Sequence, residues 1–231
     1  MKPKILLSIT GRTQKDWREK LKEIESHNIT EVALFLEFYD KQEKKKIYDA
    51  LLKSPIKNIP LVHIRHDMEK SELGFFQKNF GTKYFTCHEE NFVSHDIEQW
   101  KGFYKDIYLE MNFDNFVSKK VKVENIGGFC IDLAHFKVGL EKLSKDFEYV
   151  FDHKDQKLFS CNHLNGWDPQ KNIDMHTIYN MQKDFNYLET LPAFVFGNII
   201  ALETFNSIKE QLKFKKYLID LFLKKFKEKP D

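Results

Sequence analysis

Histidine and acidic side chains stand at the ends of successive apolar runs in this sequence. The segment GGFCIDLAH passes from apolar residues to Asp132 and His135, and KLFSCNH ends on His163. One polar residue at the end of an apolar run is ordinary, because the chain reaches water there. The repetition of His, Asp or Glu at the ends of several apolar runs is not ordinary and indicates that these residues serve a common site. The residues in this pattern are His63, His88, Glu110, Asp132, His135, His163 and Glu203.

Imidazole and carboxylate are the side chains that hold Zn, Mn or Mg ions in proteins. Two further residues of the same kinds, Asp174 and His176, follow the run that ends at His163. The joint pattern therefore predicts a site for a divalent metal, provided that the chain brings these run ends together.

The elements that would position these residues are short β-type runs that alternate with charge-rich stretches of helical period. This alternation is typical of βα units and a parallel sheet. The predicted strands are residues 4–10, 31–37, 59–65, 83–88, 106–112, 127–133, 157–163 and 198–204. The predicted helices are residues 14–27, 40–54, 69–80, 136–150, 175–189 and 206–227.

Eight such strands close most simply into a (β/α)8 barrel of the α/β class, with an open doubly wound sheet as the competing arrangement. No glycine-rich phosphate loop follows the first run, which counts against the nucleotide-binding form of the open sheet. In a barrel, the carboxyl-terminal ends of all strands meet on one face, where catalytic residues gather. The barrel therefore explains how the predicted ligands could meet.

Composition places the chain among globular proteins. Its 231 residues are 42% hydrophobic, so we expect one barrel domain over residues 1–231. The net charge of +2 gives no global basic field of the kind that attracts nucleic acid nonspecifically. No apolar stretch approaches a membrane span, and MKPKILLSIT does not have the length of a signal peptide, so we expect a cytoplasmic protein without a membrane partner. The sequence does not determine the oligomeric state, so an oligomeric partner is left open.

The residue pattern resembles the xylose isomerase-like barrels, the AP endonuclease family 2 superfamily that includes sugar isomerases, epimerases and the zinc enzyme endonuclease IV. The resemblance spans most of the chain, and the phrase CID-x-x-H is its most specific motif. The family's metal quartet is Glu, Asp, His and Glu. The residues of this chain that resemble those four ligands, in the same order, are Glu110 in LEMN, Asp132 in CIDLAH, His163 in NHLNG and Glu203 in LET.

The additional ligands resemble the endonuclease IV branch, which adds two early histidines and an Asp-x-His pair. His63, His88, Asp174 and His176 occupy those positions here. The resemblance implies up to three zinc ions, with Mn or Mg as the alternative. It implies that Glu110 bridges two ions, with His63 and His88 on the first and Asp132, His163 and Glu203 on the second, and that His135, Asp174 and His176 hold the third.

The resemblance implies a metal-dependent hydrolase that acts on a phosphoester, either DNA with an abasic site or a phosphorylated small molecule. Two segments depart from endonuclease IV, since LLSITGRT lacks its GxHxS phrase and CHEEN lacks its Pro-Gly. Arg12 and Arg65 could clamp an anionic substrate, or else pair with nearby acids such as Asp16 and Asp67. Asn165 is a further candidate substrate contact.

Two other functions remain open. A sugar isomerase or epimerase would hold one Mn or Mg on the quartet, with Glu110 and Glu203 as catalytic acid-base groups and Glu37 against a sugar-like substrate. A barrel with a purely structural or sensing metal would have no catalysis. The feature that separates the last possibility from an enzyme is a coordination position left to water.

Overall fold

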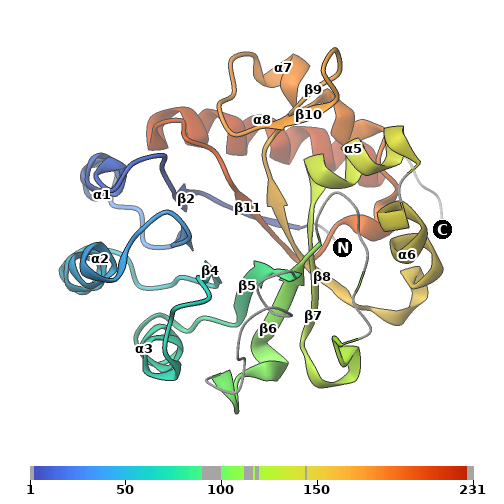
Figure 1. Ribbon diagram of the computed structural model, residues 1–231. Helices are drawn as coiled ribbons and strands as arrows, with labels where there is room; N and C mark the ends of the chain where they lie inside the picture. Colours follow the sequence, from blue (N-terminus) through green and yellow to red (C-terminus); the bar gives the residue numbers. More distant parts are fainter. Residues whose placement is uncertain (1–2, 90–99, 112–116, 118–119, 144, 228–231) are drawn as a thin grey trace.

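The strands of the protein curve into one parallel barrel in the computed structural model, which describes residues 3–89, 100–111, 117, 120–143 and 145–227 (Figure 1). All neighbouring strands of this sheet run parallel. The strands are β1 (Lys4–Leu6), β2 (Ser8–Ile9), β3 (Ala33–Phe35), β4 (Leu61–His63), β5 (Tyr84–His88), β6 (Ile107–Glu110), β7 (Gly128–Asp132), β8 (Phe159–Leu164) and β11 (Ile199–Leu202).

The barrel closes through residues 4–9, which form both ends of the sheet. β1 pairs with β11, and β2, separated from β1 by one residue, pairs with β3. Residues 4–9 therefore act as one stave, by which we mean one of the eight strand positions around the barrel. The predicted (β/α)8 architecture is confirmed, and each predicted strand overlaps an observed one.

A side chain completes this seam between the first and last staves. The Ser8 N–H donates to Gln211 Oε1 at 2.8 Å, and Gln211 Nε2 donates to the Ser8 carbonyl oxygen at 3.2 Å. Both partners are buried. The pairing of β1 with β11 ends at Leu6, so the backbone of Ser8 has no strand partner on the side that faces β11. The side-chain amide of Gln211 supplies the two hydrogen bonds that a neighbouring strand would otherwise make.

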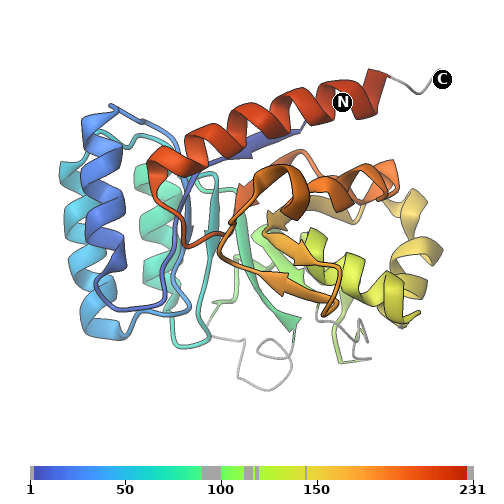
Figure 2. The same cartoon turned by 90° about the horizontal axis from the view of Figure 1, so that it is seen from above.

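Helices cover the outside of the barrel, with α1, α2 and α3 along one flank and α8 lying across the first stave (Figure 2). None of the described helices is long and apolar enough to cross a membrane. The helices are α1 (Asp16–Ser26), α2 (Lys41–Lys53), α3 (Lys70–Phe80), α5 (Leu133–Lys142), α6 (Lys145–Asp152), α7 (Met181–Asp184) and α8 (Ile208–Lys227). Short 3-10 helices lie at Tyr104–Asp106, Val123–Asn125, Lys154–Gln156, Asn186–Glu189 and Ala193–Val195.

Two predicted helices differ from the structure. The helix expected at 136–150 is divided into α5 and α6, because the chain turns at Leu143, whose φ of 51° lies in the left-handed region. The helix expected at 175–189 is wrong over its first six residues, and the remainder consists of the four-residue α7 and a four-residue 3-10 helix in place of one continuous α-helix. There Asn206 binds the N–H and the carbonyl of Ile178 through its side chain, which removes the need for helical hydrogen bonds.

A hairpin that the sequence did not predict precedes this segment. It pairs β9 (Gly166–Asp168) with β10 (Ile173–Met175) in antiparallel register. The hairpin packs on α5. It carries Asp174 to the mouth of the barrel, which is formed by the carboxyl-terminal ends of the staves.

Candidate metal centre

The inward faces of the staves place the predicted ligands in one layer. Side chains alternate between the two faces of a strand, so a residue two positions after an inward apolar residue also points inward. The inward apolar layer includes Leu6, Ala33, Phe35, Leu61, Cys130, Cys161 and Ala201. Two positions further along the same strands stand Glu37, His63, Asp132, His163 and Glu203. Because inward-facing residues recur every two positions along a strand, the ionisable side chains form a layer next to the apolar layer, on its carboxyl-terminal side.

Glu110 lies at the centre of the ionisable layer. Its Oε2 is 3.0 Å from His163 Nδ1, 3.4 Å from His63 Nδ1 and 3.8 Å from His88 Nδ1. Its Oε1 is 3.8 Å from His135 Nδ1. The side chain is only 2% exposed, so these imidazoles replace water around the carboxylate.

One side of the cluster contains Glu37, His63 and His88, each of which offers a ligand atom within 4.8 Å of the others. Glu37 Oε2 lies 3.2 Å from His88 Nε2 and 3.6 Å from His63 Nε2. The sequence suggested Glu37 as a substrate contact. The structure instead brings it against two predicted metal ligands, where its carboxylate could serve as a ligand.

The other side contains the predicted quartet, Glu110, Asp132, His163 and Glu203, again with ligand atoms within 4.8 Å of one another. All four are buried. Asp132 also begins α5, because its Oδ1 accepts the N–H of His135 at 2.8 Å. Its Oδ2 accepts from Asn165 Nδ2 at 3.0 Å, so two donors fix the orientation of this carboxylate.

The third predicted group lies where the hairpin meets the barrel. Asp174 Oδ2 is 3.2 Å from His176 Nε2 and 3.8 Å from His135 Nε2. His176 Nδ1 is 3.1 Å from the carbonyl oxygen of Glu203. The structure thus brings all nine predicted metal ligands into one connected cluster, and their roles as ligands stay a prediction.

Thr86 supports the cluster and was missed by the sequence analysis. This fully buried residue of β5 places Oγ1 3.1 Å from His63 Nδ1 and 3.0 Å from His163 Nε2. A hydroxyl oxygen has two lone pairs and can accept from both rings. If the opposite ring nitrogens hold metal, these two nitrogens carry the protons and donate to Thr86, as expected of a residue that orients metal-binding histidines.

The unsatisfied atoms of the cluster fit a bound cation. His63 Nε2, His163 Nδ1 and Glu110 Oε2 are buried, and although His163 Nδ1 is 3.0 Å from Glu110 Oε2 and His63 Nε2 is 3.6 Å from Glu37 Oε2, none of the three makes a well-aligned hydrogen bond within the described part of the chain. Buried polar atoms are normally paired, because leaving them unpaired costs free energy. Two ring nitrogens and a carboxylate oxygen are the donor types that zinc accepts. The residues present therefore fit a divalent metal ion.

Charge in the cluster is balanced by protons on imidazoles. The carboxylate of Glu110 raises the pKa of His88 to about 9. Burial alone would lower the pKa values of His135 and His176, but neighbouring carboxylates raise both to about 9. His63 differs, since burial lowers its pKa to about 4 and leaves it neutral at pH 7. A divalent ion would take over the charge that these protons supply.

The structure separates the two arginines that the sequence proposed as an anion clamp. Arg65 Nε lies 3.2 Å from Asp67 Oδ1, so this arginine has the structural partner that was its alternative role. The guanidinium of Arg12 has no carboxylate within 4.0 Å among the described residues and donates to Thr177 Oγ1 at 2.8 Å. Arg12 is therefore the better placed of the two to meet an anion.

Asn165, the other predicted substrate contact, is fully buried beneath Asp132. Its carbonyl oxygen accepts the hydroxyl of Tyr187 at 2.9 Å. This position orients a predicted metal ligand, and a direct contact with substrate stays a prediction.

The fold and the cluster together define an α/β barrel with a candidate metal centre at its mouth. No family model and no curated protein matches the chain. Among solved structures, the chain is similar to the crystal structure of SacUVDE, with 12% sequence identity and a TM-score of 0.46 over 95% of this chain and 99% of that chain. A TM-score below 0.5 supports no conclusion about function, so the proposals that follow depend on the side chains of the mouth.

Proposed function

We propose that this protein is a metal-dependent phosphoester hydrolase of the endonuclease IV-like type, with a multinuclear centre. The observation that carries the proposal is the position of Glu110, whose carboxylate contacts four imidazoles from three groups of candidate ligands. A carboxylate in that position can join two ions. A site for one ion would not need histidines on every side of the same carboxylate.

The bound ions would activate a water molecule and stabilise the leaving oxygen of the ester. Glu110 fixes the spacing of the groups around it, and Asn165 and Thr86 fix the rings and carboxylates that face it. Glu203, which is 5% exposed, joins the quartet to the third group through its contacts with His163 and His176. These residues hold the reacting groups in place and exclude bulk water from them.

Zinc is the metal that we propose, with up to three ions per chain. The candidate ligands are imidazoles and carboxylates, and structural or catalytic zinc accepts both at similar distances. Mn and Mg prefer sites richer in oxygen than the half of the cluster that contains His63 and His88. The substrate that we propose is a phosphoester, either abasic DNA or a phosphorylated small molecule, with Arg12 as an anion contact.

A sugar isomerase or epimerase with one metal is the second candidate function. A specific observation favours it, because the quartet around Glu110 and Asp132 is a complete buried ligand set by itself. Among the described residues, His135, Asp174 and His176 do not form a group whose ligand atoms all lie within 4.8 Å. The quartet would then bind the metal, and the third group would contact a sugar.

Metal stoichiometry separates these functions. Elemental analysis of the purified protein should find close to three zinc ions per chain, and the double variant Asp174→Ala, His176→Ala should contain about one fewer. The matched control replaces Asp49 and His27 by alanine, since both are exposed residues outside the cluster. One manganese or magnesium ion, unchanged in the double variant, would refute the multinuclear hydrolase. Zinc without any hydrolysis of model phosphodiesters would refute the activity.

A further inference from the structure

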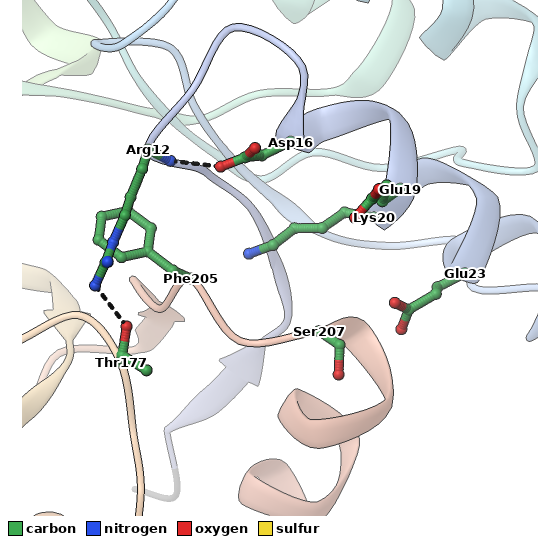
Figure 3. A pocket seen from close by; sticks show the side chains of 8 residues that line it. All are labelled: Arg12, Asp16, Glu19, Lys20, Glu23, Thr177, Phe205 and Ser207. Carbon is green, nitrogen blue, oxygen red and sulfur yellow. Dashed lines mark hydrogen bonds between the residues drawn. The ribbon is translucent and has the colours of Figure 1, made fainter.

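A pocket lies on the rim of the barrel, between α1 and the segments that contain Thr177 and Phe205 (Figure 3). Its volume of about 360 Å³ falls in the range of roughly 300–1,000 Å³ that ligand sites occupy. We call it the rim pocket. Its lining residues are Arg12, Asp16, Glu19, Lys20, Glu23, Thr177, Phe205 and Ser207.

The first cation of the rim pocket is Arg12, in the loop after the first stave. Its guanidinium lies over the ring of Phe205, 4.7 Å from the ring centroid, and donates to the hydroxyl of Thr177. These contacts hold the group in place but leave most of its five N–H donors available. In the described part of the chain it has no ion-pair partner within 4.0 Å.

The second cation is Lys20, which reaches into the rim pocket from α1 (Figure 3). The residue is only 4% exposed, and its Nζ donates to the carbonyl oxygen of Thr204 at 2.7 Å. No described carboxylate lies within 4.0 Å of it. Burial lowers the pKa of this amine to about 7 although the charges of Asp16, Glu23 and Glu210 oppose the shift, which reflects the cost of a buried charge without a carboxylate in direct contact.

Two of the acids that line the rim pocket accept hydrogen bonds from backbone N–H groups and not from the side chains of Arg12 and Lys20. Asp16 accepts the N–H of Arg12 at 2.8 Å and the N–H of Thr13 at 3.1 Å. Glu23 accepts the N–H of Lys209 at 2.8 Å and so occupies the amino-terminal end of α8. Glu19 is exposed, where water screens its charge. The amine and the guanidinium therefore keep donors that no acid of the pocket takes.

The rim pocket adjoins the candidate metal centre through shared segments. Thr177 follows His176, and Thr204 follows Glu203, so two pocket segments continue directly from predicted ligands. The ring of Phe205 lies 5.2 Å from that of His176 between centroids. The loops after the last two staves, which frequently bind phosphate in (β/α)8 barrels, contribute Thr177, Phe205 and Ser207 to the lining of the pocket.

We propose that the rim pocket binds a phosphate group of the substrate through Arg12, Lys20 and Thr177. This assignment rests on the proposed phosphoester hydrolase and adds a second point of attachment for its substrate. A guanidinium and a hydroxyl offer directional donors to phosphate oxygens, and a bound anion would favour the protonated form of the amine, which then supplies a compact charge. A substrate with two phosphate groups could place one on the metals and the other in the rim pocket.

Titration calorimetry with inorganic phosphate tests the assignment. The full chain is measured with its metals and after treatment with a chelator, at low ionic strength because salt screens such contacts. We expect phosphate to bind in both states, and Arg12→Met and Lys20→Met each to weaken binding about tenfold or more, as expected for loss of a charge-assisted hydrogen bond. The matched control is Lys22→Met, an exposed lysine of α1 outside the pocket.

The outcomes distinguish the rim pocket from the proposed function. Phosphate binding that disappears with the chelator, and that is equal in all variants, would place the ion on the metals and refute the rim pocket alone. Absence of phosphate binding in both states would also refute it. Phosphate binding that depends on Arg12, in a protein that takes up no metal, would support the pocket and refute the hydrolase. Arg12 is exposed, so its variant remains informative if Lys20→Met does not fold.

Discussion

Replacing Thr86 by valine should weaken metal binding without changing any predicted ligand. The substitution preserves the shape of the side chain but removes the oxygen that lies 3.1 Å from His63 Nδ1 and 3.0 Å from His163 Nε2. Each ring then loses the acceptor that fixes its proton, and a buried N–H without a partner costs about 1–3 kcal/mol. Loss of a residue that orients metal-binding histidines typically reduces affinity by about 10–100-fold. That range equals roughly 1.4–2.7 kcal/mol of binding free energy.

The assay is competition for zinc with a coloured chelator, in which the dissociation constant is measured directly. Thr86→Ser retains the hydroxyl and should bind metal like the unchanged protein. Thr10→Val is the matched control, because the Thr10 hydroxyl is buried but makes no hydrogen bond among the described residues. Equal zinc affinity in Thr86→Val and Thr86→Ser would show that the hydroxyl does not orient the rings, and the reasoning from its two contacts would be wrong.

Three other measurements follow from the charges of the mouth. Zinc at about 100 times its dissociation constant should stabilise the protein by roughly 2.7 kcal/mol, on the order of 5–10 °C in melting temperature, and an unchanged melting temperature would contradict a site formed by the fold. Metal binding at pH 7 should release protons, because His88, His135 and His176 have pKa values of about 9 without metal; calorimetry in buffers of different ionisation enthalpy measures that release, and uptake of protons would contradict it. Lys20 has a pKa of about 7 in the folded chain against an ordinary value of 10.5, so the unfolded chain binds more protons between these values and the free energy of unfolding should rise with pH there. Denaturant titrations should show a flatter rise in Lys20→Met, and identical slopes would exclude Lys20 as its source.

The sequence predicted the staves, and that the candidate ligands lie together at their ends, for one physical reason. A strand that is buried on both faces has a nearly continuous apolar sequence. The first charged residue after such a run therefore indicates where the strand ends. Because parallel strands around a barrel bring those ends together, the positions of Asp132 and His163 in the sequence are sufficient to predict that the two side chains lie close together. The two-residue period then decides which end residues point inward.

The remaining features depend on contacts between distant segments, which a local pattern does not contain. The helix predicted at 175–189 has a suitable helical period, but the side chain of Asn206 binds the backbone there. Thr86 reads as an ordinary strand residue, and the one available signal was its place two residues before His88 on an inward face. The different partners of Arg12 and Arg65 follow from tertiary neighbours alone.

The hydrogen bonds between Gln211 and Ser8 join two segments that are synthesised far apart in time, so the barrel can close only after the last stave and α8 have been made. The first stave is synthesised about 190 residues before β11, the strand with which β1 pairs, and the amide that completes the seam is synthesised later still. Glu37, His63 and His88 become available early, whereas Glu203 arrives only with the last stave. A nascent chain therefore contains three candidate ligands long before the candidate quartet is complete. The full candidate centre can be assembled only once the barrel has closed.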